Sequence, residues 1–172
     1  MPRNVEIKAR VDDLGAVEER ARAVATGGPV DLVQDDTFFN CAHGRLKLRD
    51  FRDGRGELIH YSRPDREGPK LSEFLLSPVA APETLREALA RAYGIVGRVV
   101  KRRRLYLAER TRIHLDSVED LGSFVELEVM LADSETPEDG NAVARDIMGR
   151  LGIGDGQLVS GAYIDLLQSR IK

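Results

Sequence analysis

Three features are scarce in this sequence of 172 residues: cysteine, long apolar runs and net charge. Cys41 is the only cysteine, so the chain can form neither an internal disulfide nor a zinc site built from cysteines. No apolar run approaches membrane-spanning length, and the amino terminus carries charges where a signal peptide is apolar. We therefore expect a soluble cytoplasmic protein with no membrane partner, in which any metal is held by oxygen or histidine.

Charged residues are abundant but balanced. Lys and Arg together number 26 and Asp and Glu 29, which leaves a net charge of only −3 although 32% of the residues are charged. A protein that binds nucleic acid through its backbone phosphates leans basic, so the balance argues against a nucleic-acid partner. The length fits a single domain, residues 1–172, with enough chain to bury a sizeable core.

Two periodicities in the hydrophobic pattern predict the secondary structure. Alternating apolar and polar residues predict strands over residues 4–11, 45–51, 57–63, 70–77, 98–107, 110–117 and 123–131. Apolar residues at helical spacing predict a helix after the first strand, one from about Pro82 to Tyr93, one from Pro137 and a short one near the carboxyl terminus. Gly27 and Gly28 are interpreted as a turn that ends the first helix.

Most of the predicted strands carry ionisable side chains on one face, at i, i+2 spacing. These are Glu6 and Lys8, then Arg45, Lys47 and Arg49, then Arg63, then Lys101 and Arg103, then Arg112, His114 and Asp116, and finally Glu126 and Glu128. In an open antiparallel sheet such faces are ordinary solvent faces. The predicted helices, however, have apolar stripes that must pack on the apolar strand faces. Seven or eight strands could therefore curl with the helices outside and the charged faces toward one another.

A lumen lined by so many charges needs water, ions and an anionic ligand, because burial of unpaired charge is costly. Lys and Arg side chains suit phosphate oxygens. Carboxylates suit Mg²⁺ or Mn²⁺, which proteins usually hold by one or two carboxylates together with substrate phosphates. Bases and acids would then serve different parts of one metal-phosphate ligand.

Groups for proton transfer or covalent catalysis are harder to find. His114 could serve as a metal or proton-transfer residue, but we expect a hydrogen-bonding residue of the wall. Ser72 and Ser123 lack a paired histidine with an acidic partner, so covalent catalysis is not expected. The catalytic residues therefore stay unassigned.

Two segments carry a resemblance to a known family. Glu6-Ile7-Lys8 at the amino terminus and Phe124-Val125-Glu126-Leu127-Glu128 near the end resemble the CYTH superfamily, the triphosphate tunnel metalloenzymes. Residues 112–128 are particularly similar to the class IV adenylyl cyclase branch. The resemblance implies an α+β fold: an eight-stranded antiparallel β-barrel, or tunnel, with helices packed on its outside, which binds a triphosphate and Mg²⁺ or Mn²⁺.

Carried over by position, the resemblance assigns roles to the charged rows. Phosphate binding falls to Lys8, Arg45, Lys47, Arg49, Arg63, Lys101, Arg103 and Arg112, and metal binding to Glu6, Asp116, Glu126 and Glu128. The chain departs from the family signature Glu-x-Glu-x-Lys at Asn4, whose amide oxygen can ligate a cation but brings no charge.

Three functions follow from this reading. The first is a class IV adenylyl cyclase-like enzyme, in which the ribose 3′-hydroxyl of ATP attacks the α-phosphate. The second is a hydrolase of tripolyphosphate, thiamine triphosphate or a nucleoside triphosphate, and the third a noncatalytic module that binds such a ligand. The expected partner is thus a small-molecule triphosphate, and formation of a homodimer is left open.

Overall fold

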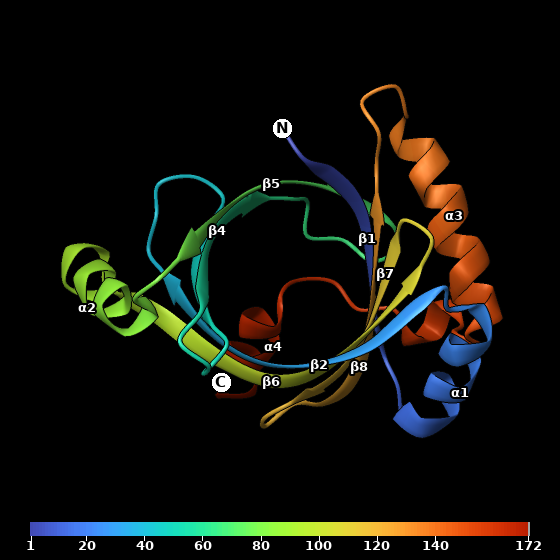
Figure 1. Cartoon of the computed structure of the whole chain (residues 1–172), viewed down its shortest axis with the longest axis horizontal. Coiled ribbons are helices and arrows are strands. Elements are labelled where there is room, and N and C mark those ends of the chain that lie inside the picture. Colours follow the sequence, from blue (N-terminus) through green and yellow to red (C-terminus); the bar gives the residue numbers. More distant parts are fainter. Residues whose placement is uncertain (172) are drawn as a thin grey trace.

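The computed structural model describes residues 1–171 and has an α+β fold in which antiparallel strands close into a ring (Figure 1). The eight strands are β1 (Arg3–Arg10), β2 (Gly27–Phe39), β3 (Arg45–Asp50), β4 (Gly56–Ser62), β5 (Lys70–Val79), β6 (Ile95–Ala108), β7 (Thr111–Val118) and β8 (Gly122–Met130). Their order around the ring is β1-β5-β4-β3-β2-β6-β7-β8, so each strand is paired on both sides. The predicted fold class is confirmed.

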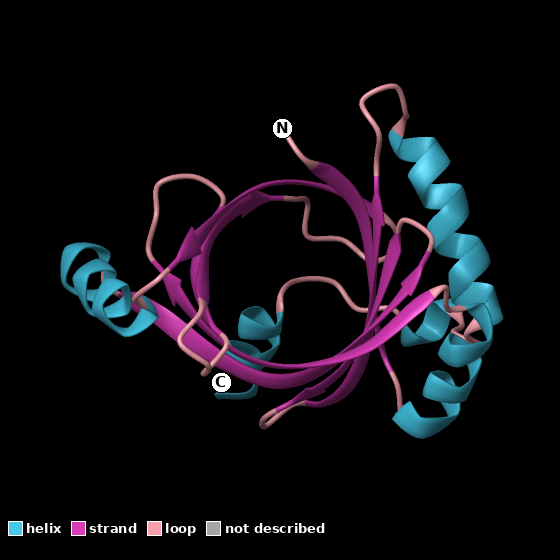
Figure 2. Cartoon of the chain, in the orientation of Figure 1, coloured by secondary structure: helices cyan, strands magenta, loops and turns pink. Residues whose placement is uncertain are grey.

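Three helices pack on the outside of the barrel and a fourth closes one end (Figures 1 and 2). The helices are α1 (Leu14–Val24), α2 (Pro82–Tyr93), α3 (Pro137–Arg150) and α4 (Tyr163–Ile171), and a single 3₁₀ turn covers Asp155–Gln157. The start of α3 is fixed by a capping box between Thr136 and Asp139. Within the described residues, no helix is both long and apolar enough to span a membrane.

The apolar side of the barrel faces outward, as the charged faces of the strands predict. Ile7 on β1, Ile113 on β7 and Leu127 on β8 are buried in one cluster against helices α1 and α3, to which Ala21 and Leu151 contribute. Each of these strand residues lies next to an inward-facing polar residue, because side chains alternate along a strand. The larger part of the core therefore lies between the barrel and helices α1 and α3, and most of the charged side chains of these strands face the lumen.

The fourth helix makes a second apolar cluster inside the barrel. Ala162, Tyr163 and Ile164 at the start of α4 pack against side chains that point inward, among them Phe38 of β2 and Phe124 of β8. The rings of Phe124 and Tyr163 meet edge to face, with their centroids 5.0 Å apart. One end of the barrel is thus closed by the last helix of the chain.

Strand β2 is the element that the hydrophobic pattern missed. The interpretation of Gly27 and Gly28 as a turn was wrong, because both belong to the thirteen-residue strand Gly27–Phe39. Polar and apolar residues occur on both of its faces: Gln34 and Phe38 share one, and Asp35 and Phe39 the other. Mixed faces produce no period-two signal.

Candidate functional site

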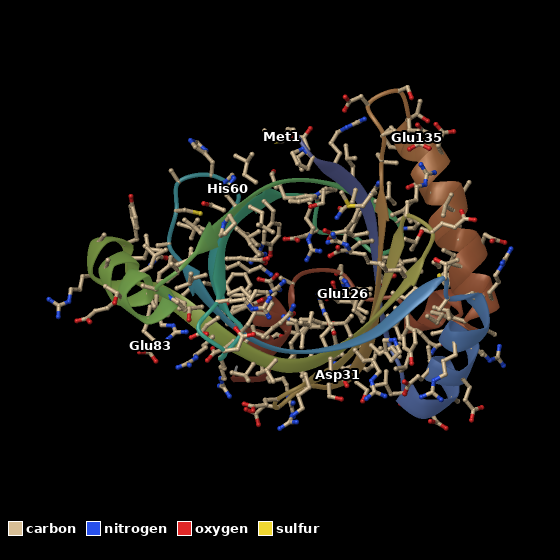
Figure 3. All side chains as sticks on the ribbon, viewed as in Figure 1. Met1, Asp31, His60, Glu83, Glu126 and Glu135 are labelled. Atoms are coloured by element: carbon tan, nitrogen blue, oxygen red, sulfur yellow. The ribbon has the colours of Figure 1, made fainter. Side chains whose placement is uncertain are left out.

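The lumen of the barrel forms a cavity of about 550 Å³ into which side chains from all eight strands point (Figure 3). Its basic lining residues are Lys8, Lys47, Arg49, Arg55, Arg63, Lys101, Arg103 and Arg112. Its acidic ones are Glu6, Asp36, Glu57, Glu126 and Glu128. Positive charge is therefore in excess within a chain that is slightly acidic overall, and this excess suits a compact polyanion.

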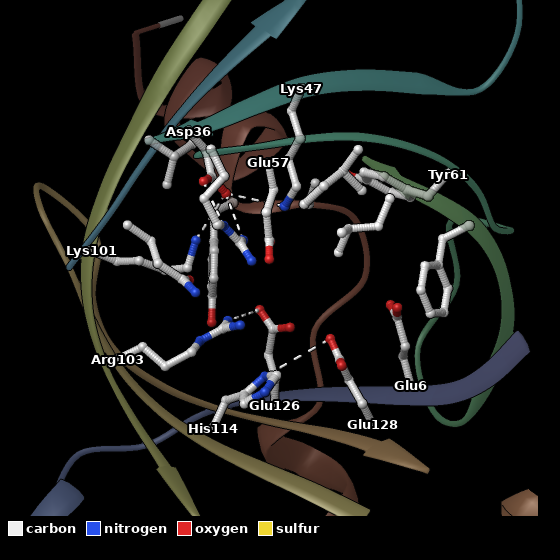
Figure 4. Close-up of a pocket in the computed structure, with 18 of the residues that line it drawn as sticks. Glu6, Asp36, Lys47, Glu57, Tyr61, Lys101, Arg103, His114, Glu126 and Glu128 are labelled. Carbon is white, nitrogen blue, oxygen red and sulfur yellow. Dashed lines mark hydrogen bonds and ion pairs between the residues drawn. The ribbon is translucent and has the colours of Figure 1, made fainter. Parts of the chain in front are cut away.

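One wall of the cavity is a basic cluster built around a single buried carboxylate (Figure 4). Asp36 on β2 accepts two hydrogen bonds from Arg49, both of 2.8 Å, and one each from Lys47 at 3.1 Å and Lys101 at 3.0 Å. Burial alone would raise the pKa of Asp36, but the cations Arg49, Lys101 and Lys47 hold it well below its ordinary value. Three cations on two strands, Lys47 and Arg49 of β3 and Lys101 of β6, are thus held in place before any ligand binds.

Two lysines of the lumen are forced toward neutrality. Burial lowers the pKa of Lys101 to about 7, and although Asp36 opposes the shift, the neighbouring Arg49 and Arg103 add to it. Burial likewise lowers the pKa of Lys8 to about 8. An incoming polyanion would favour the charged form of both lysines.

The opposite wall carries the acidic residues. Glu6 on β1 pairs with Glu128 on β8 across the strands, and Glu126 pairs in the same way with His114 on β7. Burial, and then the carboxylate of Glu6, raise the pKa of Glu128 to about 7. Burial also works against ionisation of Glu126, but Lys8 and Arg103 hold its pKa well below the ordinary value. The acidic wall thus contains carboxylates that repel one another.

The residues present fit a divalent cation on this wall. Ligand atoms of His114, Glu126 and Glu128 all lie within 4.8 Å of one another. In the part of the chain that the structure describes, neither the buried Nδ1 of His114 nor the buried Oδ1 of Asn4 has a hydrogen-bond partner. Asn4 lies two residues before Glu6 on the same face of β1. A cation would relieve the repulsion between the carboxylates and satisfy such atoms.

Most of the residues assigned from the sequence line this one cavity. They are Glu6, Lys8, Lys47, Arg49, Arg63, Lys101, Arg103, Arg112, Glu126 and Glu128. Arg45 is placed elsewhere: it lines a smaller hollow beside the cavity and pairs with Asp165 of α4 at 2.7 Å. Arg45 therefore ties the closing helix to β3.

Asp116 also lies apart from the acidic wall. The side chain is fully buried, accepts two hydrogen bonds of 2.7 Å from Arg103, and accepts a third of 2.7 Å from the hydroxyl of Tyr163. Because both oxygens are engaged and the residue does not line the cavity, this geometry suits the orientation of Arg103 rather than the predicted metal binding.

The closing helix is connected to the cavity by its first residue, Tyr163, and by Gly161 just before it. Lys8 donates a hydrogen bond of 2.9 Å to the carbonyl of Gly161, and Arg63, which is paired with Glu6, donates one of 3.2 Å to the same oxygen. The ammonium of Lys8 also lies 4.2 Å from the centroid of the Tyr163 ring. The segment that leads into α4 therefore positions two cations of the cavity, Lys8 and Arg63.

The sequence reading assigned no role to Asp36, Tyr163, Arg55 or Glu57, all of which line the cavity. Asp36 was missed together with its strand, although the row Leu32, Gln34, Asp36 and Phe38 has the i, i+2 spacing of the other inward faces. Tyr163 has no local signal, because its partner Asp116 is 47 residues away in the chain.

Comparisons with known proteins agree with this geometry. A family model described as the CYTH domain matches residues 2–163. A protein of Methanocaldococcus jannaschii, named "putative adenylate cyclase", is 25% identical over 169 residues, which cover 94% of this chain and 97% of that protein.

Solved structures show the same architecture. A Pyrococcus horikoshii protein superposes with a TM-score of 0.83 at 25% identity, and the match covers 95% of this chain and 98% of that one. A Hippeastrum protein superposes with a TM-score of 0.68 at 17% identity, over 97% of this chain and 96% of its own. That structure is described as a "putative adenylyl cyclase" that reveals a dominant triphosphatase activity.

Proposed function

The chain belongs to the CYTH family, and from this premise we propose that it is a divalent-metal-dependent enzyme that acts on a linear triphosphate bound in the barrel cavity. One observation carries the proposal: a preformed cationic cluster and a wall of carboxylates face each other across the same cavity of about 550 Å³. A metal-bound triphosphate presents the complementary arrangement, with phosphate oxygens on one side and a cation on the other.

The basic wall binds the phosphates. Lys47, Arg49 and Lys101 share the two oxygens of Asp36, so each is oriented while part of its charge remains available to a ligand. Arg103 is oriented by Asp116 from behind. Side chains that are already in place lose little conformational entropy when the ligand arrives, and they can stabilise charge that develops on a leaving phosphate.

The acidic wall holds the cation. Glu6, Glu126 and Glu128 are the carboxylates that would bind Mg²⁺ or Mn²⁺. When bound, the cation neutralises phosphate oxygens and makes the phosphorus more electrophilic.

A cyclase-like reaction is the leading candidate. In it the 3′-hydroxyl oxygen of ATP attacks the α-phosphorus, the bond to the bridging α–β oxygen breaks, and cyclic AMP and pyrophosphate form as the hydroxyl loses its proton. The M. jannaschii relative, with the name it carries, supports this choice. The Hippeastrum structure supports the second candidate, in which water attacks a terminal phosphate in the same cavity and releases inorganic phosphate.

One incubation separates these reactions. Purified protein is mixed with ATP, tripolyphosphate or thiamine triphosphate in the presence of Mg²⁺ or Mn²⁺, and the products are separated by ion-exchange chromatography. Cyclic AMP with pyrophosphate supports the cyclase, and free phosphate supports the hydrolase. Tight triphosphate binding without turnover of any of the three would contradict both.

Glu126→Gln tests whether the turnover uses the acidic wall. We expect the variant to lose metal-dependent activity by at least about a hundredfold, because it removes one carboxylate from the site that holds the cation. The matched control is Glu119→Gln, at an exposed position just beyond β7. Full activity of the Glu126 variant would rule out the assigned metal site.

A further inference from the structure

His114 is an ionisable side chain of the cavity to which the proposed function gives no role. His114 on β7 is only 4% exposed, and its Nδ1 atom is buried without a hydrogen-bond partner. The ring faces the acidic wall, where Nδ1 lies 3.9 Å from a carboxylate oxygen of Glu128 (Figure 4). That distance is too long for a hydrogen bond.

The strand register brings the imidazole to two carboxylates. His114 is directly paired with Glu126 across β7 and β8, and Glu128 lies two residues further along the same face of β8. Ligand atoms of the three residues lie within 4.8 Å of one another. Nitrogen and oxygen ligand atoms lie roughly 2.1 Å from a bound divalent transition-metal ion. Two ligand atoms of one ion are therefore at most about 4.2 Å apart. Small side-chain rotations bring all three atoms into range.

A hydrogen-bonding role in the wall, which the sequence favours, does not account for this arrangement. Such a role needs a partner for Nδ1, and no residue among 1–171 provides one. A buried polar atom without a partner costs free energy that a bound ion would recover.

We propose that His114, Glu126 and Glu128 form a mixed nitrogen-oxygen site for a first-row transition metal, with Mn²⁺ bound in preference to Mg²⁺. Magnesium selects oxygen ligands and retains its waters, whereas transition metals accept imidazole nitrogen as well as carboxylate oxygen. The inference deepens the proposed function and rests on it for the location of the metal. It adds the identity of the cation and gives His114 the role of a ligand.

Nitrogen coordination can be observed directly without any triphosphate. The full chain, freed of metal with a chelator, is loaded with Mn²⁺ and examined by pulsed electron paramagnetic resonance. We expect a hyperfine coupling from a directly bound nitrogen in the wild type and its loss in His114→Gln. Bound Mn²⁺ that shows no nitrogen coupling in the wild type would overturn the inference, as would the absence of Mn²⁺ binding.

Calorimetric titrations with Mn²⁺ and with Mg²⁺ measure the preference. Loss of even an outer-shell partner of a metal ligand typically lowers affinity about 10- to 100-fold, so we expect loss of a direct ligand in His114→Gln to lower Mn²⁺ affinity by at least about tenfold and Mg²⁺ affinity much less. His114→Asp should restore binding through oxygen while it shifts the preference toward Mg²⁺, which separates loss of a ligand from misfolding. His43→Gln, at an exposed loop position, is the matched control. Equal losses for the two cations would contradict the inference.

The result is distinct from that of the activity test. If Mn²⁺ is coordinated by nitrogen but the protein converts no triphosphate, the proposed metal site stands and the proposed function is refuted. If Mg²⁺ and Mn²⁺ support turnover equally and His114→Gln leaves activity unchanged, the proposed function stands and the mixed site is refuted.

Discussion

The two walls of the cavity differ in how completely their charges are satisfied. On the basic wall, Lys47, Arg49 and Lys101 all bond to Asp36, which is buried and fully engaged. On the acidic wall, Glu128 has a raised pKa and His114 has an unpaired nitrogen. The basic wall is therefore complete as folded, whereas the acidic wall is completed by a ligand. Under the proposed function, preorganisation is concentrated where the phosphates would bind, and the affinity for metal would come from repulsion that the metal relieves.

Removal of the anion at the centre of the basic wall should have the largest effect on stability. Asp36→Asn leaves three buried cations without their partner, and loss of one member of a buried ion pair typically costs about 3 kcal/mol or more. For a chain of this size we expect the melting temperature to fall by about 10 °C. Thermal unfolding, followed by circular dichroism, measures the change.

Tripolyphosphate should rescue part of this loss, because its oxygens replace the missing carboxylate. The control is Asp31→Asn, which removes an exposed partner of Arg104 and should change stability little. A melting temperature for Asp36→Asn within 2 °C of the wild type, roughly the effect of 1 kcal/mol, would show that the basic wall does not depend on Asp36.

The corresponding change on the acidic wall, Glu128→Gln, should stabilise the fold rather than destabilise it. The pKa of Glu128 is raised to about 7 in the folded chain, so the folded state binds more protons than the unfolded state between about pH 4.5 and 7, and stability falls as the pH rises through this range. At pH 8 the carboxylate therefore destabilises the fold. Glu128→Gln should raise the free energy of unfolding by about 1 kcal/mol in the absence of metal.

Urea unfolding of both proteins, with and without Mn²⁺, checks this prediction. We expect Mn²⁺ to stabilise the wild type and to have little effect on Glu128→Gln. A variant that is less stable than the wild type at pH 8 without metal would mean that the acidic wall is satisfied as folded.

Lys101 belongs to the basic wall and should make the affinity of this wall for a polyanion depend on pH. Because its pKa is lowered to about 7, the side chain is mostly neutral at pH 8 and must take up a proton to bind a polyanion in its charged form. Tripolyphosphate affinity should decline as the pH rises from 7 to 9, and calorimetry at pH 8 in buffers of different ionisation enthalpy should detect proton uptake. Lys101→Gln should bind about tenfold more weakly and take up fewer protons.

The neighbouring Arg102, which is exposed on the outside of β6, provides the control as Arg102→Gln. Identical proton uptake in the wild type and in Lys101→Gln would assign the titration to another group.

The smallest effect is expected at the contact between the closing helix and the basic wall. Tyr163→Phe removes the hydrogen bond to Asp116 and thereby one support of Arg103, at a cost of about 1 kcal/mol in stability. We expect KM for the triphosphate to rise by about threefold, which would correspond to less than 1 kcal/mol, while kcat changes less. Steady-state kinetics test this expectation, with Tyr93→Phe on the exposed side of α2 as the control. An unchanged KM would show that the contact of α4 with Asp116 does not contribute to phosphate binding.

The sequence predicts those parts of the molecule that have local periodicity. The inward-facing rows on β1, β6, β7 and β8 could be identified because each charged face lies opposite an apolar one. Strand β2 has mixed faces, so Asp36 could not be identified as the centre of the basic wall.

Residue type and spacing also could not predict the role of a residue whose long-range contacts decide that role. Asp116 has the same spacing as the residues of the acidic wall. Tyr163 at the start of α4 donates a hydrogen bond to it, however, and Asp116 orients Arg103. Arg45 has the spacing of Lys47, but it lies at the end of β3 where Asp165 of α4 is close. Both outcomes depend on where the last helix lies, which periodicity does not predict.

Closure of the barrel by α4 has a consequence for the order of events. Under the proposed function, a cavity closed at one end by α4 would admit its ligand and return its products through the other end, so the fragment that lies deeper would leave after the outer one.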